Sequence, residues 1–126
     1  MNPKTPTKIR KKLWKLFSQY IRQRDKGVCF TCGIKKDWRL QNAGHFIPQS
    51  SHSDTMFSEV NVNCQCVRCN KWKHGNLGVY ASKIIEKYGL DKLKELERHR
   101  DRVKIWKIPE LEELIEFYKK KLRELE

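Results

Sequence analysis

The sequence predicts a mostly helical α+β protein, with a zinc-stapled centre between an N-terminal helix and several C-terminal helices. Apolar residues recur with helical spacing at both ends of the 126-residue chain. The stretch from Val28 to Gly75 lacks this spacing and is dense in Cys, Gly, Asn and His. We therefore expect three parts: a basic arm and amphipathic helix at 1–27, the centre at 28–76, and helices at 77–126.

The first helix is expected from about Thr7 to Arg24, ending before Gly27. Its apolar stripe consists of Ile9, Leu13, Leu16, Phe17, Tyr20 and Ile21. The opposite face is basic, so this helix is expected to pack on one side and to present positive charge on the other.

Helical spacing returns at Leu77 and stops at Gly89, a residue type that commonly ends helices. A short helix from Asp91 to about Arg100 follows, and a last helix begins near Pro109. The last helix carries apolar residues with heptad spacing, namely Leu111, Ile115, Tyr118, Leu122 and Leu125. This seam either packs on the chain's own domain or forms a contact in a homodimer.

The charge of the chain favours a polyanionic partner. Lys and Arg outnumber Asp and Glu by 28 to 15, for a net charge of +13, and residues 1–75 carry 15 basic and 4 acidic side chains. This uneven excess favours nucleic acid over a merely soluble basic surface. We expect phosphate contacts from Lys8, Lys11, Lys12, Lys15, Arg22, Arg24, Lys71 and Lys73.

The hydrophobic pattern predicts a soluble, cytoplasmic protein. No apolar run approaches the roughly 18 residues of a membrane span. The N-terminal residues MNPKTPTKIRKK also lack the apolar stretch of a signal peptide.

Two Cys-x-x-Cys pairs, Cys29 with Cys32 and Cys66 with Cys69, predict a structural zinc site. Disulfides are not expected, because cytosolic thiols are kept reduced. Cys64 has no x-x partner and is expected to be a small buried residue, although its exchange with Cys66 as the ligand stays open.

The 33 residues between Cys32 and Cys66 exceed the length of a plain zinc ribbon and enclose further motifs. They contain Asn42-Ala-Gly-His45-Phe-Ile-Pro48, and Asn61 follows His45 by sixteen residues. Asn70 comes directly after the second cysteine pair. In this order and spacing the chain resembles the HNH, or ββα-metal, nucleases. The resemblance implies a treble-clef-like β-hairpin whose first strand ends at the His, followed by a helix that carries a metal ligand.

More narrowly, the whole chain resembles the phage NinG/Rap recombination endonucleases. The matching features are the basic first helix, the Cys-x-x-Cys-Gly, Ala-Gly-His-Phe and Gln-Cys-Val-x-Cys-Asn segments, Gly75-Asn-Leu77, and the acidic-to-basic last helix. The resemblance implies a phage or prophage protein that cuts branched DNA, such as Holliday junctions or D-loops. The alternatives are a non-catalytic zinc-stapled DNA-binding module and a non-specific or restriction-type HNH nuclease.

The site residues follow from chemistry and resemblance together. His45 is the expected general base, because its ordinary pKa suits proton transfer near neutral pH. The resemblance gives Asn61 the task of fixing the loop and orienting His45. Asn70, with His74 four residues later, is expected to bind Mg²⁺ or Mn²⁺. If both lie on one helix they share a face.

Simpler readings of the same residues stay open. Asn61 could cap a turn, and Asn70 could cap the following helix. Gly44 also stands where many HNH sites have an Asp ligand before the His. This departure leaves the ligand set of the catalytic ion open more than the identity of the base.

Overall fold

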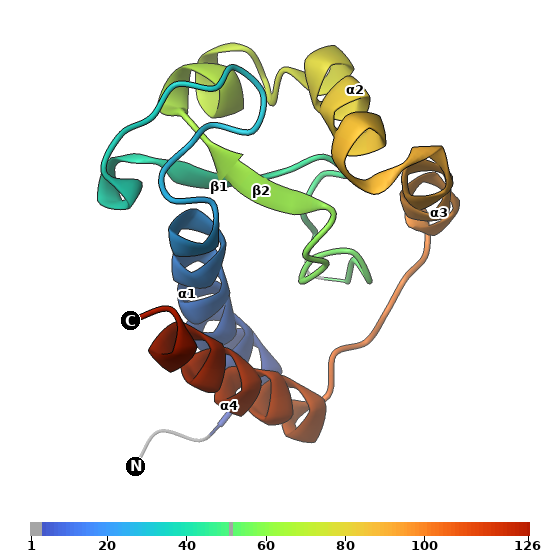
Figure 1. The fold of residues 1–126 in the computed structure, drawn as a ribbon. Coiled ribbons are helices and arrows are strands. Elements are labelled where there is room, and N and C mark those ends of the chain that lie inside the picture. Colours follow the sequence, from blue (N-terminus) through green and yellow to red (C-terminus); the bar gives the residue numbers. More distant parts are fainter. Residues whose placement is uncertain (1–3, 51) are drawn as a thin grey trace.

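The computed structural model describes residues 4–50 and 52–126, and Figure 1 shows their arrangement. The chain folds as an α+β protein in which a small hairpin lies between two pairs of helices. The elements are α1 (Pro6–Arg24), a 3₁₀ turn (Trp38–Leu40), β1 (Asn42–His45), β2 (Val62–Gln65), a π-helical turn η2 (Arg68–Trp72), α2 (Leu77–Tyr88), α3 (Leu90–His99) and α4 (Ile108–Glu124).

The bounds of the helices agree with the periodicity of the sequence to within about two residues. Thr5 caps α1, its hydroxyl oxygen accepting a hydrogen bond from the Lys8 amide, and Pro6 occupies the first turn, where no amide is needed. The helix ends at a turn in which Lys26 and Gly27 both have positive φ.

The larger core joins the two ends of the chain. In Figure 1, α1 and α4 lie against each other on one side of the hairpin. The apolar stripe of α1 meets three seam residues of α4, Leu111, Ile115 and Tyr118, all of which are buried. Packing on the chain's own domain therefore accounts for this part of the seam.

The antiparallel hairpin separates this core from the rest of the molecule. His45 pairs with Val62, and Gly44 pairs with Asn63. Because side chains alternate across a strand, His45 and Val62 face α1, whereas Gly44 and Asn63 face α2. Tyr80 of α2 closes the second face by donating a hydrogen bond to the Gly44 carbonyl at 2.7 Å.

A second, smaller core lies beneath α2 and α3, on the other side of the hairpin in Figure 1. It buries Phe46 and Ile47, which directly follow β1, against Tyr80, Ile84 and Leu96. The hairpin is thus packed on both faces, and residues after β1 are fixed from both sides. In the described ranges, no helix combines the length and apolarity that crossing a membrane requires.

Candidate functional site

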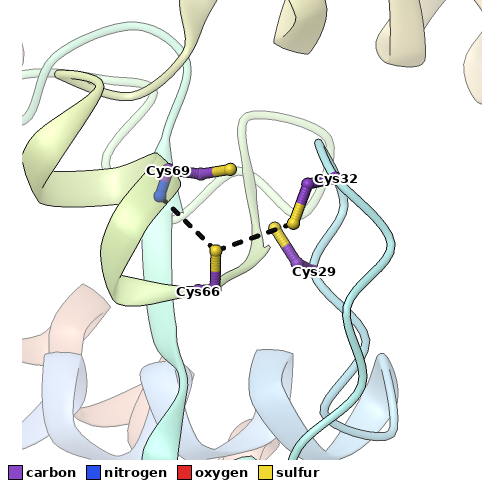
Figure 2. Close-up of side chains that lie close together, drawn as sticks. All are labelled: Cys29, Cys32, Cys66 and Cys69. Atoms are coloured by element: carbon purple, nitrogen blue, oxygen red, sulfur yellow. Dashed lines mark hydrogen bonds between the residues drawn. The ribbon is translucent and has the colours of Figure 1, made fainter.

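Four cysteines from two separate turns point toward one another (Figure 2). The Sγ atoms of Cys29, Cys32, Cys66 and Cys69 all lie within 4.8 Å of one another, and those of Cys32 and Cys66 are 3.7 Å apart. A tetrahedral zinc site with Zn–S bonds of about 2.3 Å needs sulfurs about 3.8 Å apart. The cluster can therefore bind a metal ion such as zinc.

Backbone geometry explains why each cysteine pair forms a tight turn. Gly33 has a φ of 81° and donates its amide to the Cys29 carbonyl at 2.9 Å, which closes the first turn. In the second, the Cys69 amide donates to the Cys66 sulfur at 3.4 Å, as Figure 2 shows. Both turns thus direct two sulfurs to the same side.

The cluster already favours one thiolate. Burial raises the pKa of Cys29, but hydrogen bonds from Thr31 and from neighbouring backbone amides outweigh burial and bring it down to about 6. Burial raises the pKa of Cys32 to about 12 and that of Cys66 in the same direction. A cation would favour loss of the remaining protons, because thiolates are the ligands that bind metal ions.

Cys64 lies outside this cluster, which answers the question that the spacing left open. It is fully buried on the α1 side of β2, whereas Cys66 belongs to the cluster. Burial raises the pKa of Cys64 to about 12, so its thiol stays neutral.

The hairpin and η2 bring three of the predicted site residues to one cavity of about 310 Å³. His45, Asn70 and His74 line it, together with Ala43, Phe46, Pro48, Gln49, Gly75 and Leu77. Each comes from a different local structure: the end of β1, the π-helical turn, and the loop before α2. The side chains that line this cavity include no carboxylate.

His45 is held in one tautomer. Its ring stacks on Trp14 of α1 at a centroid distance of 4.9 Å, and Nε2 lies 3.1 Å from the Met56 carbonyl oxygen. A carbonyl can only accept, so Nε2 carries the proton and Nδ1 is the basic nitrogen of the neutral ring. The residue is half-buried and lines the cavity.

Asn61 is completely buried and does not line the cavity. Its Oδ1 accepts from the Ile47 amide at 2.7 Å, and its Nδ2 donates to the carbonyls of Ile47 and Thr55. Thr55 directly precedes Met56, whose carbonyl orients His45. Asn61 is thus too deep for a catalytic role in contact with substrate, and its bonds fix the loop that orients His45.

Asn70 and His74 do not share a helical face. Asn70 lies within η2, but His74 follows its end with a φ of 51° and an exposed side chain. The condition for a shared face, that both residues lie on one helix, is not met, because η2 ends at Trp72 and His74 has a left-handed backbone conformation. Asn70 is also not the cap of α2, since the capping position belongs to Asn76.

Gly44 has no space for a side chain. An added Cβ would overlap Oε1 of Gln65 and would lie 2.9 Å from Oδ1 of Asn70. Gln65 is fully buried, and among the described side chains its Oε1 has no hydrogen-bond partner. The position expected to carry a carboxylate is therefore filled by a neutral amide from the neighbouring strand.

The basic residues divide into an internal and an exposed group. Arg24 is used internally: it pairs with Asp25 at 2.8 Å and donates to the Glu59 carbonyl and to Oδ1 of Asn63. These internal contacts leave little of the Arg24 side chain exposed, so it is less available to a phosphate than the exposed lysines. Arg22 is half-buried over the Trp38 ring. The exposed side chains are those of Lys8, Lys11, Lys12, Lys15, Lys71 and Lys73.

Comparison with known proteins gives one family. The family model described as "Bacteriophage Lambda NinG protein" matches residues 2–126. The chain belongs to the NinG family. Proteins named "Protein ninG" from Escherichia phage lambda and Salmonella phage P22 are each 33% identical to it over 109 residues, 84% of this chain. These matches cover 52% of each relative, so the chain spans about half the length of the curated NinG proteins it matches. No solved structure matches it.

Two features of this NinG-family chain were not predicted from its sequence. Gln65 lies in the buried strand β2, and its one signal in the sequence is its place in the Gln-Cys-Val-x-Cys-Asn segment, to which no task was assigned. Arg10 lines a second cavity of about 530 Å³ with Lys11 and Trp14, and this cavity shares Gln49 with the first. The basic spacing of α1 could have indicated Arg10, because it precedes Lys11 directly.

Proposed function

We propose that this chain is a metal-dependent endonuclease that hydrolyses DNA phosphodiesters at the cavity lined by His45, Asn70 and His74. The observation that carries the proposal is the state of His45. Its Nε2–H is committed to the Met56 carbonyl, which leaves Nδ1 as the basic nitrogen of a residue that lines the same cavity as two potential metal ligands. This is the arrangement that a general base requires.

The residues of the cavity then have distinct tasks. His45 Nδ1 takes a proton from the attacking water, and Trp14 and the Met56 carbonyl hold the ring in place. The Asn70 oxygen and a His74 nitrogen would hold Mg²⁺ or Mn²⁺, whose contribution is to neutralise charge on the phosphate and the leaving oxygen. Asn61 acts indirectly, as the positioning residue of the loop 46–56.

The four-cysteine cluster is proposed to hold structural zinc. Four thiolates close the coordination shell of a tetrahedral ion and leave no open position for a substrate. The cluster joins the loop before β1 to the turn after β2. Bound zinc would thus fix η2, and with it Asn70, relative to the hairpin that carries His45.

DNA is proposed to approach along α1. Arg10 and Lys11 line a cavity that adjoins the His45 cavity at Gln49. Trp14 of α1 also lines it and stacks on His45, so it connects the helix to the hairpin. Positive side chains at this place would bind phosphates on either side of the bond to be cut. The preference for branched DNA rests on the resemblance to recombination endonucleases. A homodimer would suit symmetric cuts, with contacts outside the buried seam of α4.

One observation favours a second candidate, a non-catalytic DNA-binding module. The ligands available to a hard cation in the cavity are neutral, because no carboxylate lines it and Gly44 is covered by Gln65. Neutral ligands hold Mg²⁺ weakly unless substrate phosphate completes the shell. A module that only binds DNA would need the basic α1 surface and the cysteine cluster but not His45.

The test uses labelled four-way junctions and linear duplexes of matched sequence, with Mg²⁺ or Mn²⁺ added. The endonuclease proposal expects cleavage of the junction in preference to the duplex. Retardation of the junction in a gel without any nicking under either metal would establish the binding module instead. Equal cutting of both DNAs would indicate a non-specific or restriction-type HNH nuclease.

A further inference from the structure

The carboxamide of Gln65 is fixed at one end. Its Nε2 donates to the Gly75 carbonyl at 2.9 Å and to Oγ1 of Thr31 at 3.2 Å. The Gly75 carbonyl can only accept, so the amide nitrogen must stay on that side. Oε1 therefore has to face Gly44 and Asn70.

This oxygen lacks the donor that its burial requires. Gln65 is fully buried, and Oε1 has no hydrogen-bond partner among the described residues. A buried acceptor that gives up water without gaining a donor costs free energy. The nearest other polar group at Gly44 is the half-buried Asn70 carboxamide, whose Oδ1 lies on the same side of the glycine.

Both oxygens beside Gly44 are acceptors, so neither can satisfy the other, and a half-turn of Asn70 places a donor on that side instead. The oxygen and nitrogen ends of a carboxamide have nearly the same shape, so the turn changes the hydrogen bonding but not the packing. After it, Nδ2 donates to Gln65 Oε1, and Oδ1 faces the cavity that Asn70 lines.

We propose that Gln65 is a positioning residue that accepts a hydrogen bond from Asn70 and so turns the Asn70 oxygen into the cavity. The consequence for catalysis rests on the proposed function, but the hydrogen bond itself does not. Gly44 is part of the arrangement, because any side chain there would displace Gln65 Oε1.

The same contacts connect the cysteine cluster to the cavity. Cys29 Sγ lies 3.4 Å from Thr31 Oγ1, which in turn accepts from Gln65. Gly75, the other anchor of Gln65, donates its amide to the Cys69 carbonyl at 2.9 Å. Contacts from both cysteine turns therefore fix the position of the Gln65 side chain. Through its proposed hydrogen bond, Gln65 in turn fixes the orientation of the Asn70 oxygen.

The direct test is the exchange of the Asn70 side-chain amide protons with water, followed by NMR in the full chain. We expect slow exchange in the wild type and loss of that protection in Gln65→Met. Gln41→Met is the matched control, because Gln41 is also buried, donates Nε2 to backbone carbonyls and has an unpaired Oε1. It should leave Asn70 protected. Wild-type Asn70 protons that exchange as fast as those of free asparagine would overturn the proposal even if Gln65→Met fails to fold.

Cleavage of the four-way junction adds a functional readout. Loss of an outer partner of a metal ligand typically costs about 10- to 100-fold, so Gln65→Met should slow cleavage by that factor and Gln41→Met should not. Because Gln65 acts through Asn70, adding Gln65→Met to Asn70→Ala should cause no further loss. A full additional loss in the double variant, or a wild-type rate in folded Gln65→Met, would contradict the assignment. If the wild type cuts no DNA, the proposed function fails, and proton exchange alone decides the role of Gln65.

Discussion

Trp14, the Met56 carbonyl and burial together determine the orientation and protonation of the His45 imidazole. Burial lowers its pKa from the ordinary 6.5, and the hydrogen bond to the Met56 carbonyl opposes this effect in part. A lowered pKa keeps the ring neutral at physiological pH, with Nδ1 free to accept a proton. The ring is thus kept neutral without a carboxylate partner, as the proposed general base requires.

This state predicts the pH dependence of cleavage. The neutral ring is the active form, so the rate should be constant at neutral pH and fall as acid protonates Nδ1, with a midpoint below 6.5. Single-turnover cleavage between about pH 4.5 and 8 measures it, and circular dichroism at each pH checks that the chain stays folded. A midpoint above 7 would mean that another group controls the rate.

Asn61 and Gln65 show that burial decides the role of a polar side chain here. Both are fully buried, and both bond to backbone groups next to a cavity residue. The sequence predicted a task for Asn61 through its spacing from His45, but Gln65 had no such spacing. It belongs to the Gln-Cys-Val-x-Cys-Asn segment, but Gly44 and Asn70 become its neighbours only after the hairpin and η2 have formed, so the sequence indicated no role for its side chain.

From the sequence, the heptad seam of α4 could pack either on the chain's own domain or on a second copy of the chain. In the fold, its seam packs on α1 and buries Leu111, Ile115 and Tyr118. Helical periodicity predicted the bounds of this helix well, but it could not choose between an intramolecular and an intermolecular surface. That choice depends on the return of the chain through residues 100–107 to the first helix (Figure 1).

Substitution within this seam should reduce stability independently of protein concentration. Ile115→Ala, at a residue only 4% exposed, should cost about 2–4 kcal/mol of unfolding free energy. Leu125→Ala is the control, at the C-cap of the same helix, and with 45% exposure it should cost less than about 1 kcal/mol. Urea unfolding at two protein concentrations measures both. A concentration-dependent midpoint would show that the seam also serves a dimer.

The basic face of α1 should control affinity for DNA. Replacing Arg10 and Lys11 with Ala removes two cations beside the His45 cavity, so binding should weaken and the salt dependence should fall by about one unit per lost phosphate contact. Lys94→Ala with Lys120→Ala is the matched control, since both residues are exposed on other helices. Fluorescence anisotropy at several salt concentrations distinguishes the pairs. An equal loss of DNA affinity in both double variants would indicate that net charge, and not contacts from α1, controls binding.

Across the whole molecule, two helix pairs hold one hairpin, and the cysteine cluster ties its ends together. Each part of this arrangement was predictable to a different degree. The helices follow from periodicity, and the cysteine cluster follows from paired Cys-x-x-Cys spacing. The break between η2 and His74 could not be predicted, because η2 is a five-residue π-helical turn whose one buried residue is Cys69, too short for apolar spacing to reveal.

The cluster should be required for stability. Purified protein should contain about one zinc per chain, and Cys29→Ser should lose both the metal and several degrees of melting temperature. Cys64→Ala is the matched control, because Cys64 is buried outside the cluster and should keep its zinc. Metal analysis and thermal melts measure the pair. Full zinc content in Cys29→Ser would contradict the proposed ligand set.

We propose that His45 is the general base in its cavity, and replacing its side chain tests that role. Single-turnover cleavage of a labelled four-way junction should fall about 100-fold or more in His45→Ala, as expected for loss of a general base. Junction binding should be unchanged, and His52→Ala, at an exposed histidine of the neighbouring loop, should cleave at the wild-type rate. Equal cleavage by folded His45→Ala and wild type would contradict the account.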